Sequence, residues 1–272
     1  YDVITSEPPP PRTAFTVNLY TQEYYELQKS KLKPGGIAAQ WIPLHSQGEK
    51  EVAMHFKTFQ SVFPYTMGWL SVANEILIIG SDQPIKIDFN KLSQRLQEPE
   101  VKKALKDIEI PDIFSFLSNI WLLNEQVVKL GEGFPIITDN HPAIEFYLEL
   151  GNVIGIPGQE RYVFNRARFD DVAKQITNLS EENQKKLKAH YDAMDLYQRG
   201  VMYSNRGQLL KAMTLVEDDD LFRYHLQADR QQMQRLTQLI EEEPDNLQYM
   251  LNLAHSFYQI GNYEQSMEIL QV

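Results

Sequence analysis

The sequence contains no cysteine, so disulfides, thiolate metal ligands and a cysteine nucleophile are all excluded. It also lacks an excess of basic residues. Its 26 Lys and Arg residues stand against 37 Asp and Glu residues, which gives a net charge of −11. This balance argues against a nucleic-acid surface and favours cationic small molecules or basic partners. The missing cysteines agree with a reducing compartment, and we expect the protein to be cytoplasmic.

Long apolar runs are missing as well. Crossing a bilayer takes about 20 apolar residues, whereas the longest runs here, such as residues 76–80, have the length of a strand. Membrane segments in a longer parent protein are left open. The chain has 272 residues, of which 43% are hydrophobic, so we expect a sizeable core and about two domains.

Residues 1–6 have the apolar character of a buried strand, with no leader segment before them. We therefore expect the chain to be part of a longer protein. The sequence has no glycine-rich turn of the kind that binds a nucleotide or an adenosyl group. We expect the half of the domain that would carry such a turn to precede this chain.

Strand and helix patterns alternate from residue 1 to about residue 82. Thr21 is a suitable N-cap for the first helix, with Glu23 in its first turn, and Pro34 and Gly35 would end that helix. The order predicts the second half of an open, mostly parallel α/β sheet. The expected elements are a strand at 2–6, a helix from 21 to about 33, a strand at 37–42, a helix at 49–63, and strands around Trp69 and at 76–79 with Asn74 in the hairpin turn.

Beyond this sheet the pattern becomes less regular. Residues 87–130 predict short helices, and residues 134–149 return to strand-like character around Asp139. A stretch with Gly and Pro begins at residue 151 and is followed by a short helix near residues 170–176. We therefore expect an α/β domain at residues 1–150 and a linker at residues 151–179.

Ser180 is a suitable N-cap for a long helix, and residues 180–272 predict an all-α region of helix hairpins. The hairpin at residues 247–270 resembles a tetratricopeptide repeat, in which small and aromatic residues at fixed offsets let two helices pack closely. An earlier unit around Gly207 resembles the repeat less closely. The residues that carry the resemblance in the last hairpin are Pro244, Leu253, Ala254, Phe257, Gly261, Tyr263 and Ser266.

One ordered set of motifs is more informative than the rest. An acidic, proline-rich loop at residues 7–11 is followed by Leu19-Tyr20, by Glu23-Tyr24-Tyr25, and by Leu-x-Pro-Gly-Gly at residues 32–36. This series resembles the spermidine synthase family of polyamine aminopropyltransferases. The resemblance covers residues 1–82 and resumes near residues 137–147. It implies a Rossmann-like sheet of the S-adenosylmethionine-dependent transferase type.

The resemblance also implies a chemistry. An amine attacks the propyl carbon of decarboxylated S-adenosylmethionine, the co-substrate of the parent enzyme. The amine is normally protonated, so a carboxylate must hold it and take up a proton. A polyamine needs a second carboxylate for its far ammonium group. We expect no cofactor to be bound by this fragment alone, because the adenosyl-binding half is missing.

Two residues inherit roles from the family, and a third is a candidate by its position in the expected sheet. Glu7 takes the first acidic position of the loop and is the catalytic candidate, whereas Pro10 stands at the usual position of the base and cannot accept a proton. Asp139, in a segment similar to the family's late Ser-Asp-x-His, is expected to bind a substrate amine. Gln40, at the expected end of its strand, is a second substrate-binding candidate.

Each of these residues also has a structural interpretation. Glu7 could only solvate its loop, Asp139 could cap a turn, and Gln40 could tie down a loop. His141 has no partner in the sequence and is interpreted as a packing or hydrogen-bonding residue. The six histidines show no paired ligand spacing, which argues against a metal site.

The sequence leaves more than one function open. The first is part of an aminopropyltransferase-like enzyme, and the second is a catalytically silent scaffold of the same shape whose helical tail binds a protein partner. A methyltransferase on the same fold is a third, because fold does not fix function. Whether the chain forms a homo-oligomer is also left open.

Overall fold

The computed structural model describes residues 1–44, 47–72, 75–108, 110, 112–145, 162, 164–202, 223–259 and 263–270. The chain divides into two compact units. The first comprises residues 1–94 and 117–188, and the second comprises residues 95–116 and 189–272. Within the described ranges, no helix is both long and apolar enough to cross a membrane.

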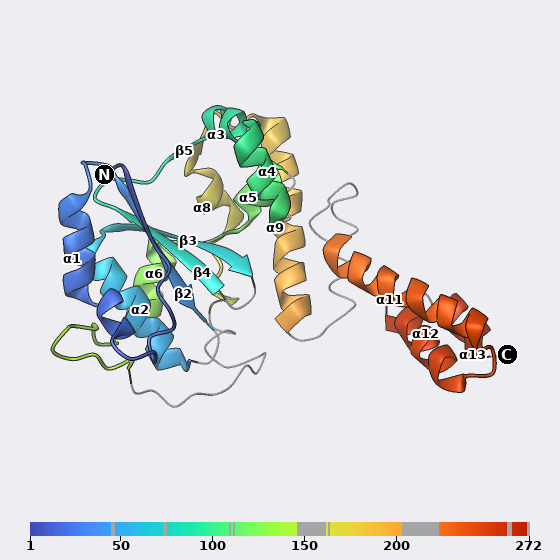
Figure 1. Ribbon diagram of the computed structural model, residues 1–272. Helices are drawn as coiled ribbons and strands as arrows, with labels where there is room; N and C mark the ends of the chain where they lie inside the picture. Colours follow the sequence, from blue (N-terminus) through green and yellow to red (C-terminus); the bar gives the residue numbers. More distant parts are fainter. Residues whose placement is uncertain are drawn as a thin grey trace. The chain divides into compact units, whose positions relative to one another are not determined.

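The first unit is built on a five-stranded sheet with the order β1-β2-β4-β3-β6 (Figure 1). β1 and β2 are parallel, and the other three pairs are antiparallel. The predicted hairpin is confirmed, although Asn74 lies outside the described residues. The prediction of a mostly parallel sheet is wrong, because the hairpin places β4 beside β2. The strands are β1 (Val3–Ser6), β2 (Ile37–Pro43), β3 (Tyr65–Val72), β4 (Glu75–Ser81) and β6 (Ile120–Leu123).

A layer of helices packs on this sheet (Figure 1). The helices of the layer are α1 (Gln22–Lys31), α2 (Glu49–Val62) and α6 (Asn124–Gly131). The Thr21 side chain accepts a hydrogen bond from the Tyr24 N–H (3.3 Å), which confirms Thr21 as the N-cap of α1. The helix ends before Gly35, whose φ of +73° suits a glycine after a helix.

Gly80 on β4 fixes the close approach of α2 to the sheet. A Cβ at this position would lie 2.5 Å from Phe59 Cε1 and 2.7 Å from Phe63 Cβ. Gly80 pairs with Ala38 on β2, and both phenylalanines are fully buried. The hydrophobic core of the unit therefore lies between α2 and the centre of the sheet.

The segment from residue 87 to residue 145 contains both helices and a strand. The expected short helices are present as α3 (Phe89–Leu96), α4 (Pro99–Asp107), α5 (Ile113–Ser118) and α6. β6 was not predicted, because a four-residue apolar run is compatible with either a strand or a buried helix. The strand expected at residues 134–149 is absent from its described part, residues 134–145, which holds only an isolated bridge between Thr138 and His141.

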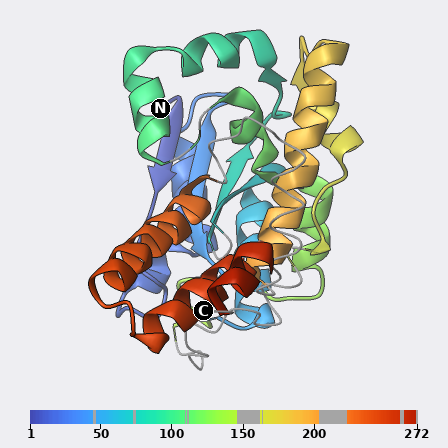
Figure 2. The same cartoon turned by 90° about the vertical axis from the view of Figure 1, so that its right-hand side faces the viewer.

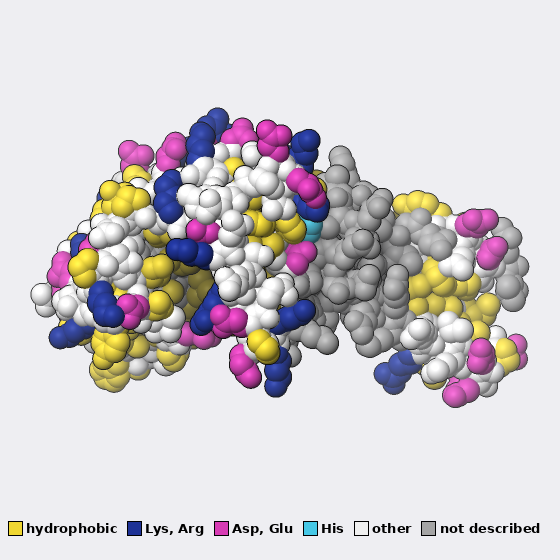
Figure 3. Space-filling model, turned by 90° about the horizontal axis from the view of Figure 1, so that it is seen from above, with side chains coloured by type: hydrophobic (Ala, Val, Ile, Leu, Met, Phe, Trp, Pro, Cys, Tyr) yellow, Lys and Arg dark blue, Asp and Glu magenta, His cyan; other side chains and the backbone are white. Residues whose placement is uncertain are grey.

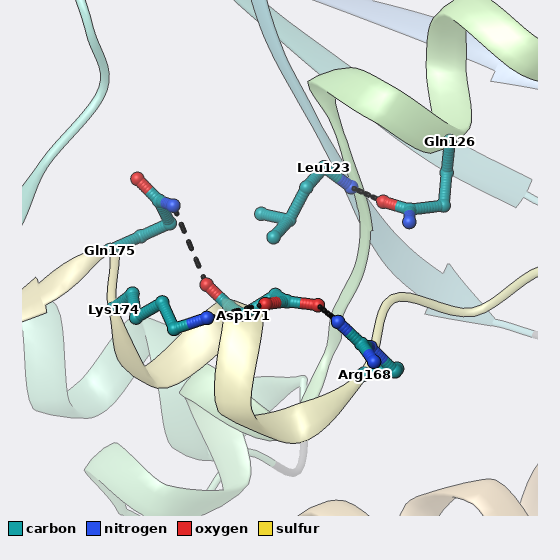
Figure 4. Close-up of polar contacts among 6 residues, drawn as sticks. All are labelled: Leu123, Gln126, Arg168, Asp171, Lys174 and Gln175. Atoms are coloured by element: carbon teal, nitrogen blue, oxygen red, sulfur yellow. Dashed lines mark hydrogen bonds and ion pairs between the residues drawn. The ribbon is translucent and has the colours of Figure 1, made fainter.

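Residues 168–178 also belong to the first unit. The short strands β5 (Ile87–Asp88) and β7 (Ile176–Thr177) pair in parallel, and α8 (Phe169–Ala173) corresponds to the short helix expected near residues 170–176. Asp171 accepts hydrogen bonds from Lys174 and from Arg168, both at 2.9 Å (Figure 4). These two cations, Lys174 first, lower the pKa of the Asp171 carboxyl.

The expected domain limits at residues 150 and 180 stay a prediction, because residues 146–161 lie outside the described part. α9 (Glu181–Met202) begins directly after Ser180. The Ser180 hydroxyl accepts a hydrogen bond from the Asn183 N–H at 3.2 Å, which confirms Ser180 as an N-cap. In the second unit, α5 and α9 meet where the rings of Phe114 and His190 lie 5.5 Å apart.

The second unit ends in a helical tail, residues 223–270, in which neighbouring helices pack together (Figures 1 and 2). Its helices are α11 (Arg223–Glu242), α12 (Leu247–Gln259) and α13 (Tyr263–Leu270). Met233, Leu236 and Leu253 form its buried cluster. The expected helix pair at residues 247–270 is confirmed, whereas its tetratricopeptide character stays a prediction. Gly207 and Gly261 lie outside the described residues.

Candidate functional site

Residues of β1, β2 and α1 meet at the carboxyl end of β1. Ser6, the last residue of β1, pairs with Gln40 on β2. The Ser6 hydroxyl shares a hydrogen bond with the hydroxyl of Tyr24 on α1, at 3.1 Å. In open α/β sheets ligands bind outside this edge of the strands. Residues that bind a substrate are therefore expected at this edge of the sheet.

Tyr20 holds the proline-rich loop that follows β1. Its hydroxyl lies 3.2 Å from the carbonyl oxygens of both Pro8 and Pro9 and donates to them. The tyrosine is fully buried, and its ring meets the ring of His55 edge-on, with the centroids 4.9 Å apart. The loop is thus attached to the core by a side chain from the next part of the chain.

Glu7 lies directly before this attachment and is exposed. Its carboxylate has no hydrogen-bond or ionic partner in the described part of the chain. The Pro10 carbonyl accepts a hydrogen bond from the Thr13 N–H at 2.9 Å, so this residue serves only the turn. The loop therefore offers one free carboxylate and no second one.

Asp139 lies in a tight turn. The His141 N–H donates to the backbone oxygen of Thr138 (3.0 Å) and to its hydroxyl (3.1 Å), which leaves Asp139 and Asn140 at the two central, exposed positions. Thr138 closes the turn, and the Asp139 carboxylate has no partner among the described residues. The alternative role of Asp139 as a turn cap is therefore taken by Thr138. His141 is exposed and contributes through its backbone.

Hydrogen bonds connect the Asp139 turn to α1 and α2. The Asp139 N–H donates to the Glu23 carboxylate of α1 at 3.1 Å, and the Gln22 N–H donates to the Ile137 carbonyl at 2.9 Å. The Ile137 N–H donates to the Thr58 hydroxyl of α2, also at 2.9 Å. These contacts place two exposed carboxylates, Glu23 and Asp139, side by side at the start of α1.

The Tyr20 side chain connects the Glu7 loop with the Asp139 turn. Its ring belongs to a buried cluster with Val17, Met54, Ile137 and Ile144, two of which flank the turn. Its hydroxyl meanwhile binds the loop that follows Glu7. The sequence did not single out Tyr20 for this role, because a tyrosine next to a helix start is ordinarily a packing residue.

Gln40 is fully buried and lies within β2, which continues to Pro43, so the expectation that it ends its strand is wrong. Side chains alternate along a strand, so Gln40 faces the same side as Ala38, the side on which Phe59 packs. Its Nε2 donates to the Trp41 carbonyl at 3.3 Å, whereas its Oε1 has no partner among the described residues. A buried acceptor without a donor costs free energy, and the substrate-binding role of the fully buried Gln40 stays a prediction.

Two residues of α1 share this property. The Tyr25 hydroxyl and both amide atoms of Gln28 are buried without a described partner. Burial raises the pKa of Tyr25 well above its usual value, so the hydroxyl stays protonated. Tyr25 packs edge-on against Phe59, with the ring centroids 5.0 Å apart. Tyr25 and Gln28 therefore add polar, uncharged groups to the buried side of α1.

His55 is the residue that sequence reasoning missed. Its Nε2 lies 3.1 Å from Gln47 Oε1, and Gln47 donates to the Pro43 carbonyl at 2.7 Å. Complete burial lowers the pKa of His55 to about 3, so the ring is neutral near pH 7. The signal that could have found it is its place among the apolar residues of α2, where a histidine is buried rather than solvated.

This arrangement combines exposed carboxylates with neutral acceptors, and it suits a cation better than an anion. Within the described ranges, no group of three or more His, Asp or Glu side chains is arranged to hold a metal ion. No protein-family profile and no curated protein matches this chain.

Proposed function

We propose that this chain is the substrate-facing half of an aminopropyltransferase-like domain of the spermidine synthase type, and that its acidic edge receives a polyamine. The observation that carries the proposal is the bond from the Asp139 N–H to the Glu23 carboxylate. The two exposed carboxylates lie at the start of α1, next to Tyr24, whose hydroxyl shares a hydrogen bond with Ser6 at the end of β1. A diammonium ligand needs such a pair of carboxylates.

The outer edge of β1 supports the proposal as well. β1 pairs with β2 on one side only, and Val3 on this short strand is 56% exposed. Exposed apolar residues on a strand edge invite pairing with a further strand. In the parent protein that strand would come from the half of the domain that holds decarboxylated S-adenosylmethionine. No glycine-rich turn occurs in this sequence, so we assign no residue here to the co-substrate.

A second function, the catalytically silent scaffold, rests on Pro10. The prolyl residue at the expected position of the base has no group that takes up a proton, and only Glu7 remains in the loop. Polyamine binding without aminopropyl transfer would fit this second function. The distinction needs turnover by the parent protein, whereas binding is accessible with the chain itself.

Asp139→Asn tests the proposed binding. We expect titration of spermidine into the chain, followed by calorimetry at low salt, to show an affinity about tenfold to hundredfold lower for the variant. The melting temperature should be unchanged, because Thr138 closes the turn. Glu132→Gln is the matched control, since Glu132 is exposed at the end of α6 and should leave the affinity unchanged. Equal affinities in all three proteins would refute the acidic edge as a polyamine site.

The isolated chain should not bind decarboxylated S-adenosylmethionine, because it lacks a glycine-rich turn. Calorimetry with the nucleoside at concentrations up to about 1 mM, a weak-binding limit of roughly −4 kcal/mol, should give no saturable heat. Micromolar binding would mean that the adenosyl group is recognised by residues of this chain, and the assignment of the two halves would have to be reversed.

A further inference from the structure

The outer face of α12 carries an apolar stripe. Leu247, Leu251 and Tyr258 project within about 40° of one another, given 100° of rotation per residue. Each is at least 52% exposed. The same helix already buries Leu253, which points to another side, in the cluster with Met233 and Leu236. Helix α12 is therefore apolar over a wider arc than the packing within the tail uses.

The next helix, α13, has a matching stripe. Tyr263, Met267 and Leu270 recur at helical spacing, and each is at least 52% exposed. Ser266, at the edge of this stripe, is buried, and its hydroxyl donates to the Ala254 carbonyl at 2.7 Å. The rings of Tyr258 and Tyr263 meet at a centroid distance of 5.3 Å and join the two stripes. We call these six residues the tail face; Figure 3 shows apolar side chains gathered on the tail helices.

The stretch of sequence that contains the tail face has charges of one sign, whereas α11 carries the exposed Arg235. From Leu236 to Val272 the sequence contains no Lys or Arg. A second copy of the chain would bring the same acidic side chains together, and this repulsion disfavours self-association through the tail face. The six acidic residues of this stretch, all exposed, are Glu241, Glu242, Glu243, Asp245, Glu264 and Glu268.

We propose that the tail face binds a basic amphipathic helix of a partner protein. Apolar residues of the partner at i, i+3 or i+4, and i+7 would fill the stripe, and flanking Lys and Arg side chains would meet the acidic residues. Contiguous apolar surface framed by polar residues is typical of a protein interaction site. This inference does not depend on the polyamine site, because no residue of the first unit takes part.

The test uses the full 272-residue chain and a fluorescent helical peptide of about 18 residues composed of Leu and Lys, with Leu at amphipathic spacing. A matched peptide carries Glu in place of Lys. We expect anisotropy to show binding of the Lys peptide and about tenfold weaker binding to Met267→Ser and to Tyr258→Ser. Leu27→Ser is the matched control, because Leu27 is equally exposed on α1. Its affinity should equal that of the unaltered chain.

Three results would overturn the inference. Equal affinity of Met267→Ser and the unaltered chain would place the peptide elsewhere. Equal binding of the Glu peptide would remove the argument from charge. A dimer in sedimentation experiments that dissociates in Met267→Ser would show that a second copy covers the tail face. Circular dichroism of each variant checks that the tail helices remain folded.

Discussion

The core of the first unit and the tail face differ in how far their apolar side chains are buried. In the first unit Phe59, Tyr25 and Trp121 are completely buried. In the tail, Tyr258 and Met267 are more than half exposed. The buried aromatic residues of the first unit therefore contribute to folding, whereas Tyr258 on the tail face is available for binding.

The largest expected effect on stability comes from a substitution in the core of the first unit. Phe59→Ala should lower the free energy of unfolding by about 3–5 kcal/mol, because it leaves a cavity between α2 and the sheet. Tyr258→Ala should change it by less than about 0.5 kcal/mol. All three tryptophans, Trp41, Trp69 and Trp121, belong to the first unit. Urea unfolding followed by tryptophan fluorescence thus measures that unit alone.

If Phe59→Ala does not fold, Phe59→Leu serves instead, since it retains much of the apolar volume and should give a smaller loss. A loss for Tyr258→Ala as large as that for Phe59→Ala would contradict the contrast between the units. It would mean that the tail stabilises the first unit.

This contrast bears on how far the sequence could predict the fold. The spacing of apolar residues and the residues that begin and end helices were sufficient to predict the β1–α1–β2 unit, because Thr21 and Gly35 mark both ends of the helix. They were not sufficient for β6, whose four apolar residues fit a strand or a buried helix equally well. The strand order could not be predicted from the sequence either, because the pairing of β4 with β2 depends on tertiary packing at Gly80.

The site was predictable only in part. Glu7 and Asp139 were found through their motifs, and their substrate roles stay predictions. Their structural connection was not predictable, because Tyr20 and Glu23 contact segments that lie more than a hundred residues away in the sequence. The neutral state of His55 was hidden as well, since it depends on burial and not on any neighbouring charge.

The pH dependence of the free energy of unfolding gives a second expected effect, which is smaller than that of Phe59→Ala. His55 has a pKa of about 3 in the folded chain, against about 6.5 when unfolded. The unfolded chain therefore binds more protons between these values, and stability falls as the pH falls. Between about pH 6.5 and pH 5 this histidine should lower the free energy of unfolding by about 2 kcal/mol.

Urea unfolding of the first unit at both pH values measures this effect in the unaltered chain and in His55→Gln. The variant should lose about 2 kcal/mol less on acidification. His141→Gln is the control, because His141 is exposed and should leave the pH dependence as it is. The same slope in all three proteins would show that His55 does not remain neutral in the fold.

The smallest expected effect compares two helix caps, one buried and one exposed. Thr21 accepts from the Tyr24 N–H and donates to the Asn18 carbonyl at 3.1 Å, and it is completely buried. Ser180 caps α9 from an exposed position. Thr21→Ala should therefore cost about 1–2 kcal/mol and Ser180→Ala about 0.5–1 kcal/mol, because water replaces only the exposed cap. Tryptophan fluorescence measures the first loss, and hydrogen exchange of the Asn183 amide measures the second.

Thr21→Ser retains the hydroxyl and should restore most of the stability. Equal losses at the two caps would show that burial does not strengthen this bond, and a failure of Thr21→Ser to recover stability would attribute the effect to the lost methyl group.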